Sequence, residues 1–210
     1  MKRPWDRGLL VVVEGIDGAG KSTLARALVE RLRALGHEVV ASREPTDGPH
    51  GTRLRQSATT GRLSPAEELE TFIADRREHV SELLLPSLAA GKIVVLDRYY
   101  FSTAAYQGSR GLDWRSILER NESFAPEPDV LLIPELAIEH SLERIRARGD
   151  VANEFERIDN LQKVDAVFRA LERPELTRLD ATLPPGVLCD RALDIVLAGL
   201  QRRRAATQKS

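Results

Sequence analysis

Residues 15–22 carry the sequence pattern of a loop that binds the phosphates of a nucleotide. The run fits G-x-x-x-x-G-K-[ST] at every fixed position, and it lies between an apolar segment and an amphipathic one, as this loop requires. It comprises Gly15, Ile16, Asp17, Gly18, Ala19, Gly20, Lys21 and Ser22. Its glycines let the backbone turn tightly, so that its amides and that of Thr23 can approach phosphate oxygens.

The last two residues of the pattern predict the ligands. We expect Lys21 to reach the β- and γ-phosphates of ATP and the Ser22 hydroxyl to bind Mg²⁺. The alternative, a glycine-rich turn without a function, leaves the flanking strand and helix patterns unexplained.

A carboxylate and a guanidinium follow a second strongly apolar segment. Residues 93–96 are apolar, and Asp97 and Arg98 come directly after them. If this strand lies beside the strand that enters the phosphate loop, Asp97 can hold Mg²⁺ through water and Arg98 can stabilise the charge on a transferring phosphoryl group. Alternatively, Asp97 caps the following helix and Arg98 is a surface charge.

A third cation follows another apolar segment. Arg43-Glu44-Pro45 occupies the corresponding position there, and Pro45 favours an extended conformation for Glu44. Lys21, Arg43 and Arg98 would then converge at one edge of the sheet. A single triphosphate needs fewer cations, so the surplus indicates a second, phosphorylated substrate.

Short apolar segments alternate with amphipathic ones along the chain. Segments 9–14, 38–42, 93–97 and 130–133 are rich in Val, Ile and Leu, as buried parallel strands are, and a weaker strand is predicted at 176–179. Helices are predicted over 21–35, 65–90, 113–120, 138–148, 159–172 and 188–202. The alternation predicts an α/β fold of the P-loop NTPase type, in three layers, with a five-stranded parallel sheet flanked by helices. Ligands then lie beyond the carboxyl ends of the strands.

The composition is typical of a globular protein with one core. The chain has 210 residues and a net charge of −1, which predicts a single domain over 1–210 and no binding to nucleic acid. The apolar run Leu9–Val13 is too short to cross a membrane, and the single cysteine, Cys189, fits a reducing compartment, so we expect a cytoplasmic protein. Residues 203–210 are polar and basic and are predicted to form a flexible tail.

Residues 97–108 carry a resemblance to a known family. Their sequence, DRYYFSTAAYQG, is similar to the DR[YH]-x-x-S-x-x-A-[YF] signature of thymidylate kinases. Asp17 in the phosphate loop, the Arg43-Glu44-Pro45 run and the segment 72–77 also resemble that family, in the family's order over about residues 8–200. The resemblance implies an enzyme that transfers the γ-phosphoryl group of ATP to dTMP, with Mg²⁺, and that forms a homodimer.

The resemblance also implies roles at the base of the acceptor nucleotide. Phe72 is expected to stack on thymine, and Arg76, one helical turn further on, to bond a base carbonyl. Thr103 and Gln107 fall where the family contacts the base edge. As an alternative, Phe72 is an aromatic side chain of the core.

At the sugar and phosphate the resemblance implies four further contacts. Tyr106 is expected to crowd the 2′ position and so favour deoxyribose, although it could instead pack a helix. Asp17 would reach the 3′-hydroxyl or the water shell of the metal. Arg43 and Arg98 would hold the 5′-phosphate.

A short basic lid is predicted over about residues 144–157, because the transfer must exclude water. Arg144 and Arg148 share a helix face and could reach the phosphates of ATP, or they could simply complement the helix C-terminus. Gly18 offers no side chain from the loop. The resemblance to the bacterial type therefore implies that the lid supplies the catalytic arginine, for which we select Arg148, with Arg144 as an ATP contact.

Two segments depart from the family pattern. Pro134 comes early and Glu135 stands where an aspartate is usual, so we expect the fourth strand to end sooner. In the lid, Glu154 replaces an arginine of the usual D-R-F-E phrase, and Arg148 or Arg157 would have to take over its role.

Two other functions stay open. One is a P-loop kinase for a different pyrimidine nucleotide or deoxynucleoside, and the other is a nucleotide-binding protein with weak or no turnover. The chain lacks the N-K-x-D motif of guanine-nucleotide switches, which counts against the second.

Overall fold

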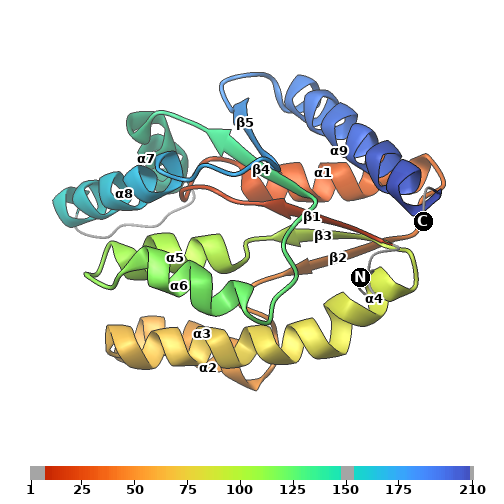
Figure 1. Cartoon of the computed structure of the whole chain (residues 1–210). Helices are drawn as coiled ribbons and strands as arrows, with labels where there is room; N and C mark the ends of the chain where they lie inside the picture. Colours follow the sequence, from red (N-terminus) through yellow and green to blue (C-terminus); the bar gives the residue numbers. More distant parts are fainter. Residues whose placement is uncertain (1–7, 148–153, 209–210) are drawn as a thin grey trace.

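The computed structural model describes residues 8–147 and 154–208 of the chain (Figure 1). It confirms the predicted fold class. Five parallel strands form one sheet in the order β2-β3-β1-β4-β5. The strands are β1 Leu9–Val13, β2 Val39–Arg43, β3 Ile93–Asp97, β4 Val130–Glu135 and β5 Leu176–Asp180.

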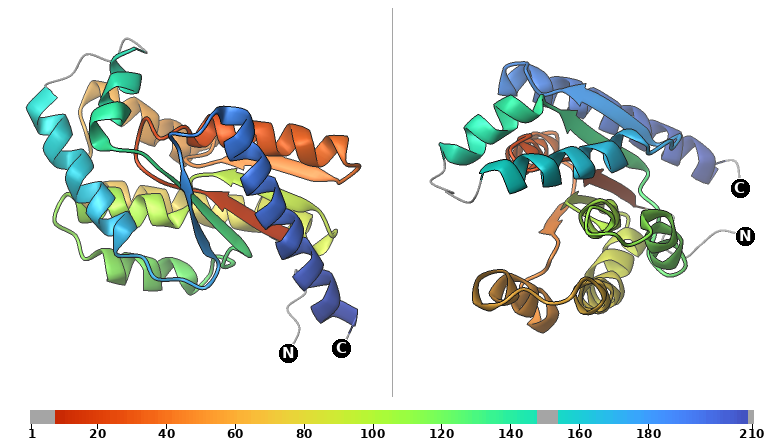
Figure 2. Two further views of the ribbon diagram at one scale, coloured as in Figure 1. Left: turned by 90° about the horizontal axis from the view of Figure 1, so that it is seen from above. Right: turned by 90° about the vertical axis from the view of Figure 1, so that its left-hand side faces the viewer.

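Helices cover both faces of the sheet. They are α1 Lys21–Ala34, α2 Pro49–Thr60, α3 Pro65–His79, the π-helix η1 Val80–Leu84, α4 Leu85–Ala89, α5 Tyr100–Gly108, α6 Trp114–Glu122, α7 Ile138–Arg146, α8 Glu154–Arg169 and α9 Pro185–Gln208. The right-hand view of Figure 2 shows α1 and the α5–α6 pair on opposite sides of the sheet. The three central strands are buried on both faces, which explains their continuous apolar sequences.

The long helix predicted from residue 65 begins as expected. The Ser64 hydroxyl accepts from the Glu67 amide, and the Glu67 carboxylate accepts from the Ser64 amide, which makes a complete capping box. Near its C-terminal end the helix widens into η1 and then resumes as α4. Pro86 lies in the first turn of α4 and has no N–H to donate to the preceding turn, so a local change of helix type at this point is expected.

Some elements differ from the sequence predictions. Helices α2 and α5 were not predicted, and α8 begins at Glu154, before the predicted start at 159. The segment from residue 203, predicted to be a flexible tail, is helical as far as Gln208, because α9 continues to that residue. The side chain of Arg203 donates to the Gly8 carbonyl and pairs with Asp129, which ties this end of α9 to the body of the protein.

The prediction that the fourth strand ends early is also wrong. Strand β4 continues to Glu135, paired with β5, although its pairing with β1 stops at Leu132. Leu132 accepts from Glu14 on the β1 side, and Pro134, two residues further, faces the same side. At that level the chain has left β1 for the phosphate loop, so the missing N–H of Pro134 removes no ladder bond.

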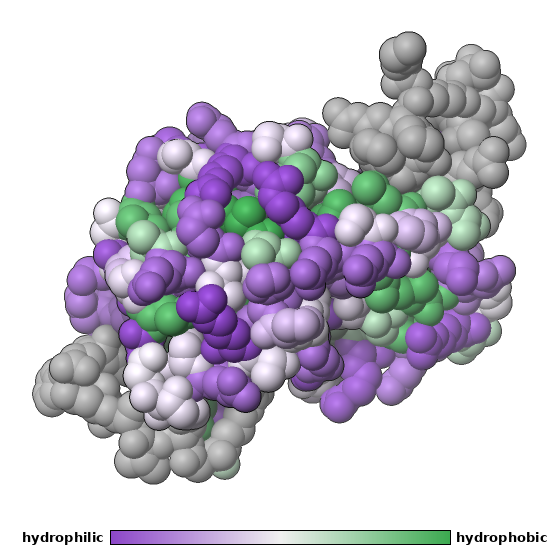
Figure 3. All heavy atoms as spheres, turned by 90° about the horizontal axis from the view of Figure 1, so that it is seen from below, coloured by the Kyte–Doolittle hydropathy of each residue, from purple (hydrophilic) through white to green (hydrophobic). Residues whose placement is uncertain are grey.

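Figure 3 shows the underside of the view in Figure 1, where α2 and α3 lie. Apolar side chains come to this surface in several small patches that polar side chains separate. Within the described residues, no helix is both long enough and apolar enough to cross a membrane.

Candidate active site

The phosphate loop joins β1 to α1, as the sequence predicts. Gly18 and Gly20 have φ values of +83° and +94°, which side chains with a Cβ rarely adopt. A Cβ at Gly18 would also collide with the backbone of Ser141 in α7, which rests on the loop at this point. The predicted glycine pattern is thus required both by the turn and by the close approach of α7.

Lys21 begins α1 and is almost fully buried. Its Nζ donates to the carbonyl oxygen of Ile16 at 2.7 Å and lies 3.9 Å from Oδ1 of Asp17. Burial, with the neighbouring charge of Arg98, lowers the pKa of Lys21 to about 7. The ammonium therefore lies inside the loop, where a triphosphate would supply the charge that stabilises it.

Asp97 ends β3 beside the phosphate loop, because β3 is the neighbour of β1 and Val13 is the register partner of Asp97. Its Oδ1 is buried and has no hydrogen-bond partner among the described residues. Asp97 and Ser22 line the same groove, so both oxygens can serve one cation.

These two residues fit Mg²⁺. In the described part of the chain, no three His, Cys, Asp or Glu side chains gather into a complete metal site. Mg²⁺ at a phosphoryl-transfer site keeps waters and substrate phosphates as ligands and needs only one or two protein oxygens. An unpartnered carboxylate oxygen and a nearby hydroxyl meet that need.

Arg98 lies between the phosphate loop and a neighbouring cavity. Its guanidinium pairs with Asp17 through Nη2 and donates to the Ser102 hydroxyl through Nη1, 3.1 Å away. Burial acts to raise the pKa of Asp17, but the charges of Arg98 and Lys21 outweigh it and hold that pKa below its usual value. The alternative that Asp97 caps a helix and Arg98 is a surface charge is wrong, because Tyr99 is the N-cap of α5 and Arg98 is only 24% exposed.

The cavity beside Arg98 has a volume of about 170 Å³. It brings together residues from the phosphate loop, the segment after β2, α3 and α5. Its lining includes seven of the predicted substrate residues: Asp17, Phe72, Arg76, Arg98, Thr103, Tyr106 and Gln107.

The lining of this cavity includes an unpartnered amide. Gln107 is fully buried, and neither its amide nitrogen nor its amide oxygen has a hydrogen-bond partner among the described residues. Phe72 is half-buried, which leaves part of its ring facing the cavity. A planar ligand with both a donor and an acceptor on its edge would satisfy these groups.

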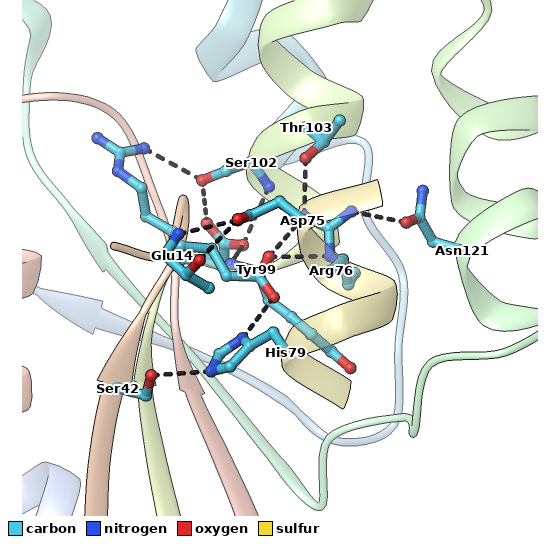
Figure 4. A network of polar contacts seen from close by, with 12 residues as sticks. Glu14, Ser42, Asp75, Arg76, His79, Tyr99, Ser102, Thr103 and Asn121 are labelled. Carbon is cyan, nitrogen blue, oxygen red and sulfur yellow. Dashed lines mark hydrogen bonds and ion pairs between the residues drawn. The ribbon is translucent and has the colours of Figure 1, made fainter. Parts of the chain in front are cut away.

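Arg76 is held more tightly by the protein than the sequence predicts. Its Nε and Nη2 donate to Oε2 of Glu44, at 2.9 and 2.6 Å. Nη1 donates to Asn121 at 2.6 Å, and Nη2 also donates to Thr103 at 2.9 Å (Figure 4). Four of its five N–H donors thus have acceptors among the described residues, and one hydrogen on Nη1 is left for a ligand.

Comparison with known proteins agrees with this geometry. A family model described as Thymidylate kinase matches residues 13–191. A thymidylate kinase of Xanthomonas euvesicatoria pv. vesicatoria is 53% identical over 196 residues, which are 93% of this chain and 86% of the relative. A thymidylate kinase of Xylella fastidiosa is 48% identical over 199 residues, 95% of this chain and 91% of the relative.

The chain belongs to the thymidylate kinase family. It is therefore an enzyme, a phosphotransferase, and the resemblance drawn from residues 97–108 is confirmed.

One residue predicted from the thymidylate kinase signature lies away from the acceptor cavity. Arg43 is 62% exposed and pairs with Asp47 at 2.8 Å. It lines the other groove, of about 590 Å³, together with Ser22 and Asp97. Its predicted contact with a 5′-phosphate stays a prediction, and the structure places it in the groove of Ser22 and Asp97.

The residues predicted to contact ATP beyond the phosphate loop are described only in part. Arg144 on α7 donates to the Ala181 carbonyl at 3.1 Å and approaches the Gly18 carbonyl, so it lies over the phosphate loop. Thr23 is exposed on the first turn of α1. Arg148 lies outside the described residues, as do the side chains of residues 154–157, which include Glu154 and Arg157.

Four buried residues in or around the cavity were given no role by the sequence analysis: Glu14, Glu44, His79 and Asn121. Glu14 directly follows β1, whose residues are all apolar, and that abrupt change to a carboxylate was an available signal. His79 is three residues after Arg76 and thus shares its helix face. The sequence carries no comparable signal for Asn121.

Proposed function

We propose that this member of the thymidylate kinase family transfers the γ-phosphoryl group of ATP to dTMP, giving dTDP and ADP. One observation carries the proposal. One cavity is lined both by the unpartnered Gln107 amide and by Arg98 and Asp17, and Asp17 belongs to the phosphate loop. A pyrimidine deoxynucleotide with its base at Gln107 would direct its 5′-phosphate toward the γ-phosphate of ATP.

The base end of the cavity suits thymine. The ring has neighbouring carbonyl and N–H groups, which match the acceptor and donor of the Gln107 amide. The remaining N–H of Arg76 can bond a second carbonyl, and the Phe72 ring can stack on the base face. We assign Tyr106, whose ring lies under the Arg98 guanidinium with 5.3 Å from its centroid to Cζ, to the sugar.

The phosphoryl transfer depends on positioning and charge neutralisation, and it does not depend on a side chain that acts as a general base. A bond forms between an acceptor phosphate oxygen and the γ-phosphorus, and the bond from the γ-phosphorus to the β–γ bridging oxygen breaks. The acceptor phosphate is mostly a dianion at neutral pH, since its second pKa is about 6, so no side chain must remove a proton. Arg98 and Lys21 would neutralise the equatorial oxygens, and Asp17 would orient Arg98.

Mg²⁺, held by Asp97 and Ser22, would supply additional positive charge at the phosphates of ATP. Within the lid over about 144–157 we retain Arg148 as the catalytic arginine and Arg144 as an ATP contact. We also propose one domain over 1–210, a homodimer and a cytoplasmic location, on the strength of the family resemblance and the composition.

ADP release with Mg·ATP and a panel of acceptors tests the function. We expect turnover on dTMP to exceed that on dUMP, UMP, CMP and thymidine. Turnover on thymidine alone would instead identify a nucleoside kinase. ATP binding without turnover on any acceptor would contradict the enzymatic proposal.

Gln107→Leu tests the assignment of the base site. The substitution keeps the size of the side chain and removes its polar atoms, so kcat/KM for dTMP should fall about 10- to 100-fold while KM for ATP stays nearly constant. Gln56→Leu, at an exposed position on α2, is the matched control and should leave both values unchanged. A rise in KM for ATP in Gln107→Leu would place the base site elsewhere.

A further inference from the structure

We propose that Glu14 is a positioning residue for the phosphoryl acceptor: it holds Arg98, through Ser102 and the first turn of α5, in the orientation that binds the acceptor phosphate. The inference rests on the proposed function, because it assumes that Arg98 faces the 5′-phosphate of a nucleotide. Glu14 is fully buried and does not line the acceptor cavity, so it acts through other residues.

The Glu14 carboxylate is an acceptor for three donors from the segment that follows Arg98. Oε1 accepts from the amides of Tyr99 at 2.7 Å and Ser102 at 3.0 Å, and Oε2 accepts from the Ser102 hydroxyl at 2.5 Å. Figure 4 shows Glu14 beside Ser102 and Tyr99 at the start of α5. These three contacts suit the ionised carboxylate, which can accept all three hydrogens, whereas a protonated carboxyl would have to donate one itself.

This arrangement makes Glu14 a helix cap that comes from a distant part of the chain. Tyr99 is the N-cap of α5 and its own side chain caps nothing. Glu14 accepts from the amides of the N-cap and of Ser102, the third helical residue, which are the donors that a capping box would satisfy. The partial positive charge of the helix N-terminus stabilises the carboxylate in return. Burial raises the pKa of Glu14, and the hydrogen bonds of Ser102 and the charge of Arg98 act against that rise.

The same bonds fix an unusual backbone conformation at Arg98. Its φ is +72°, in the left-handed region, which costs about 1–2 kcal/mol for a residue with a Cβ. The Arg98 amide donates to the Val13 carbonyl at 3.0 Å, and Glu14 anchors the two amides that follow the turn. Glu14 thus completes the restraint on the turn that directs the Arg98 side chain toward the phosphate loop.

Ser102 extends the restraint to the guanidinium itself. Its hydroxyl donates to Glu14 and accepts from Nη1 of Arg98, while Nη2 of Arg98 pairs with Asp17. Because the Ser102 oxygen is oriented by Glu14, its lone pair is directed at Arg98. Loss of the Glu14 charge should therefore misplace Arg98 without altering the base end of the cavity.

Glu14→Gln tests this proposal by calorimetric titration of dTMP and of thymidine, each without ATP. Gln keeps the shape but has only one acceptor oxygen. With that oxygen toward the amides of Tyr99 and Ser102, the NH2 group faces the Ser102 hydroxyl and cannot accept from it. We expect the Kd for dTMP to rise about tenfold and the Kd for thymidine, which has no phosphate, to change less than about twofold. Glu44→Gln is the matched control: it also neutralises a buried carboxylate, but at the base end, so it should weaken both ligands equally.

Ser102→Ala provides a second variant in case Glu14→Gln does not fold. It removes the hydroxyl that links Glu14 to Arg98 and keeps the hydrogen bonds from the Tyr99 and Ser102 amides to Glu14. It should therefore also raise the Kd for dTMP and leave the Kd for thymidine nearly unchanged. If Glu14 acts through Ser102, the double variant is no weaker in dTMP binding than the more affected single variant.

The outcomes separate this inference from the proposed function. A wild-type protein that binds neither dTMP nor thymidine overturns both. The inference alone is overturned if the wild-type protein binds both ligands and the variants at Glu14 and Ser102 weaken the binding of both equally. It is also overturned if these variants weaken the binding of neither. A fall in melting temperature with unchanged affinities would mean that Glu14 is only structural.

Discussion

Two buried carboxylates support the acceptor cavity, one at each end, and they do so in different ways. Glu14 at the phosphate end caps α5 and reaches Arg98 only through Ser102. Glu44 at the base end binds Arg76 directly with Oε2 and lies 3.0 Å from Nδ1 of His79 with Oε1. The Glu14 carboxylate is stabilised mainly by hydrogen bonds from neutral backbone and hydroxyl groups. The Glu44 carboxylate is stabilised by an ion pair with Arg76.

The difference determines how much each arginine contributes to stability. Arg76 and Glu44 are 1% and 3% exposed, so each is the main compensation for the burial of the other. Arg98 and Asp17 are 24% and 48% exposed, so water can replace part of their interaction. We infer that Arg76 is both a structural and a binding residue, and that Arg98 serves mainly function.

Arg76→Ala should have the largest effect. It leaves the Glu44 carboxylate buried without its cation, which costs about 3–5 kcal/mol of unfolding free energy and lowers Tm by roughly 10 °C. Calorimetric melting measures this loss. Turnover of dTMP should fall as well, while the ATP affinity of the folded fraction stays nearly intact.

Arg77→Ala is the matched control for Arg76. Arg77 is the next residue on α3, is exposed and stacks on Phe124 with 4.0 Å from Cζ to the ring centroid. Its removal should change Tm by only about 1–2 °C. Equal melting temperatures for the two variants would contradict the structural role of the Arg76–Glu44 pair.

Arg98→Ala should produce the next largest effect, on catalysis. Loss of a cation that neutralises the transferring group lowers kcat/KM for dTMP about 10²- to 10³-fold. Because Asp17 is half-exposed, Tm should fall by clearly less than in Arg76→Ala. Steady-state kinetics and melting on the same preparation give both values, with Arg120→Ala, which removes an exposed partner of Glu70, as the control.

If Arg98→Ala lowers Tm as much as Arg76→Ala does, the proposed difference between the two arginines is wrong. Such a result would mean that Glu14 depends on the charge of Arg98 as Glu44 depends on Arg76, although no hydrogen bond joins Glu14 to the Arg98 side chain directly in the described network.

The sequence was a good guide to the parts of the fold that repeat a simple pattern. The strands were found because both faces of the sheet are covered and the runs are continuously apolar. Helix α3 was found from its capping box. Helix α5 was not, since its cap comes from Glu14, more than 80 residues earlier, and a local pattern cannot contain it.

The same limit applies to the site. The residues that we propose to contact a ligand follow compact motifs, and seven of the predicted substrate residues line one cavity. The residues that hold them, such as Asn121 beside Arg76, come from other elements and meet only through the fold. Pro134 shows the reverse case: it predicted the end of a strand, but β4 continues, because β1 has already ended on the side that Pro134 faces.

Thr103→Val should have the smallest effect. It tests where the hydrogen bonds around Glu14 end and those around Glu44 and Arg76 begin. Ser102 and Thr103 are consecutive residues of α5, yet Ser102 binds Glu14 and Arg98 while Thr103 accepts from Arg76 at 2.9 Å. Valine keeps the shape of Thr103 and removes that acceptor, so the unfolding free energy should fall by about 1 kcal/mol.

The affinities of Thr103→Val for dTMP and thymidine decide which network the residue serves. A shifted Arg76 weakens contacts to the base, which both ligands share, so both Kd values should rise by the same factor of about two to five. Ser102→Ala, one residue earlier, should affect dTMP alone. If Thr103→Val also weakens the binding of dTMP alone, the Thr103 hydroxyl supports the phosphate end of the cavity, as Ser102 does. The boundary between the Glu14 and Glu44 networks would then not lie between these two residues.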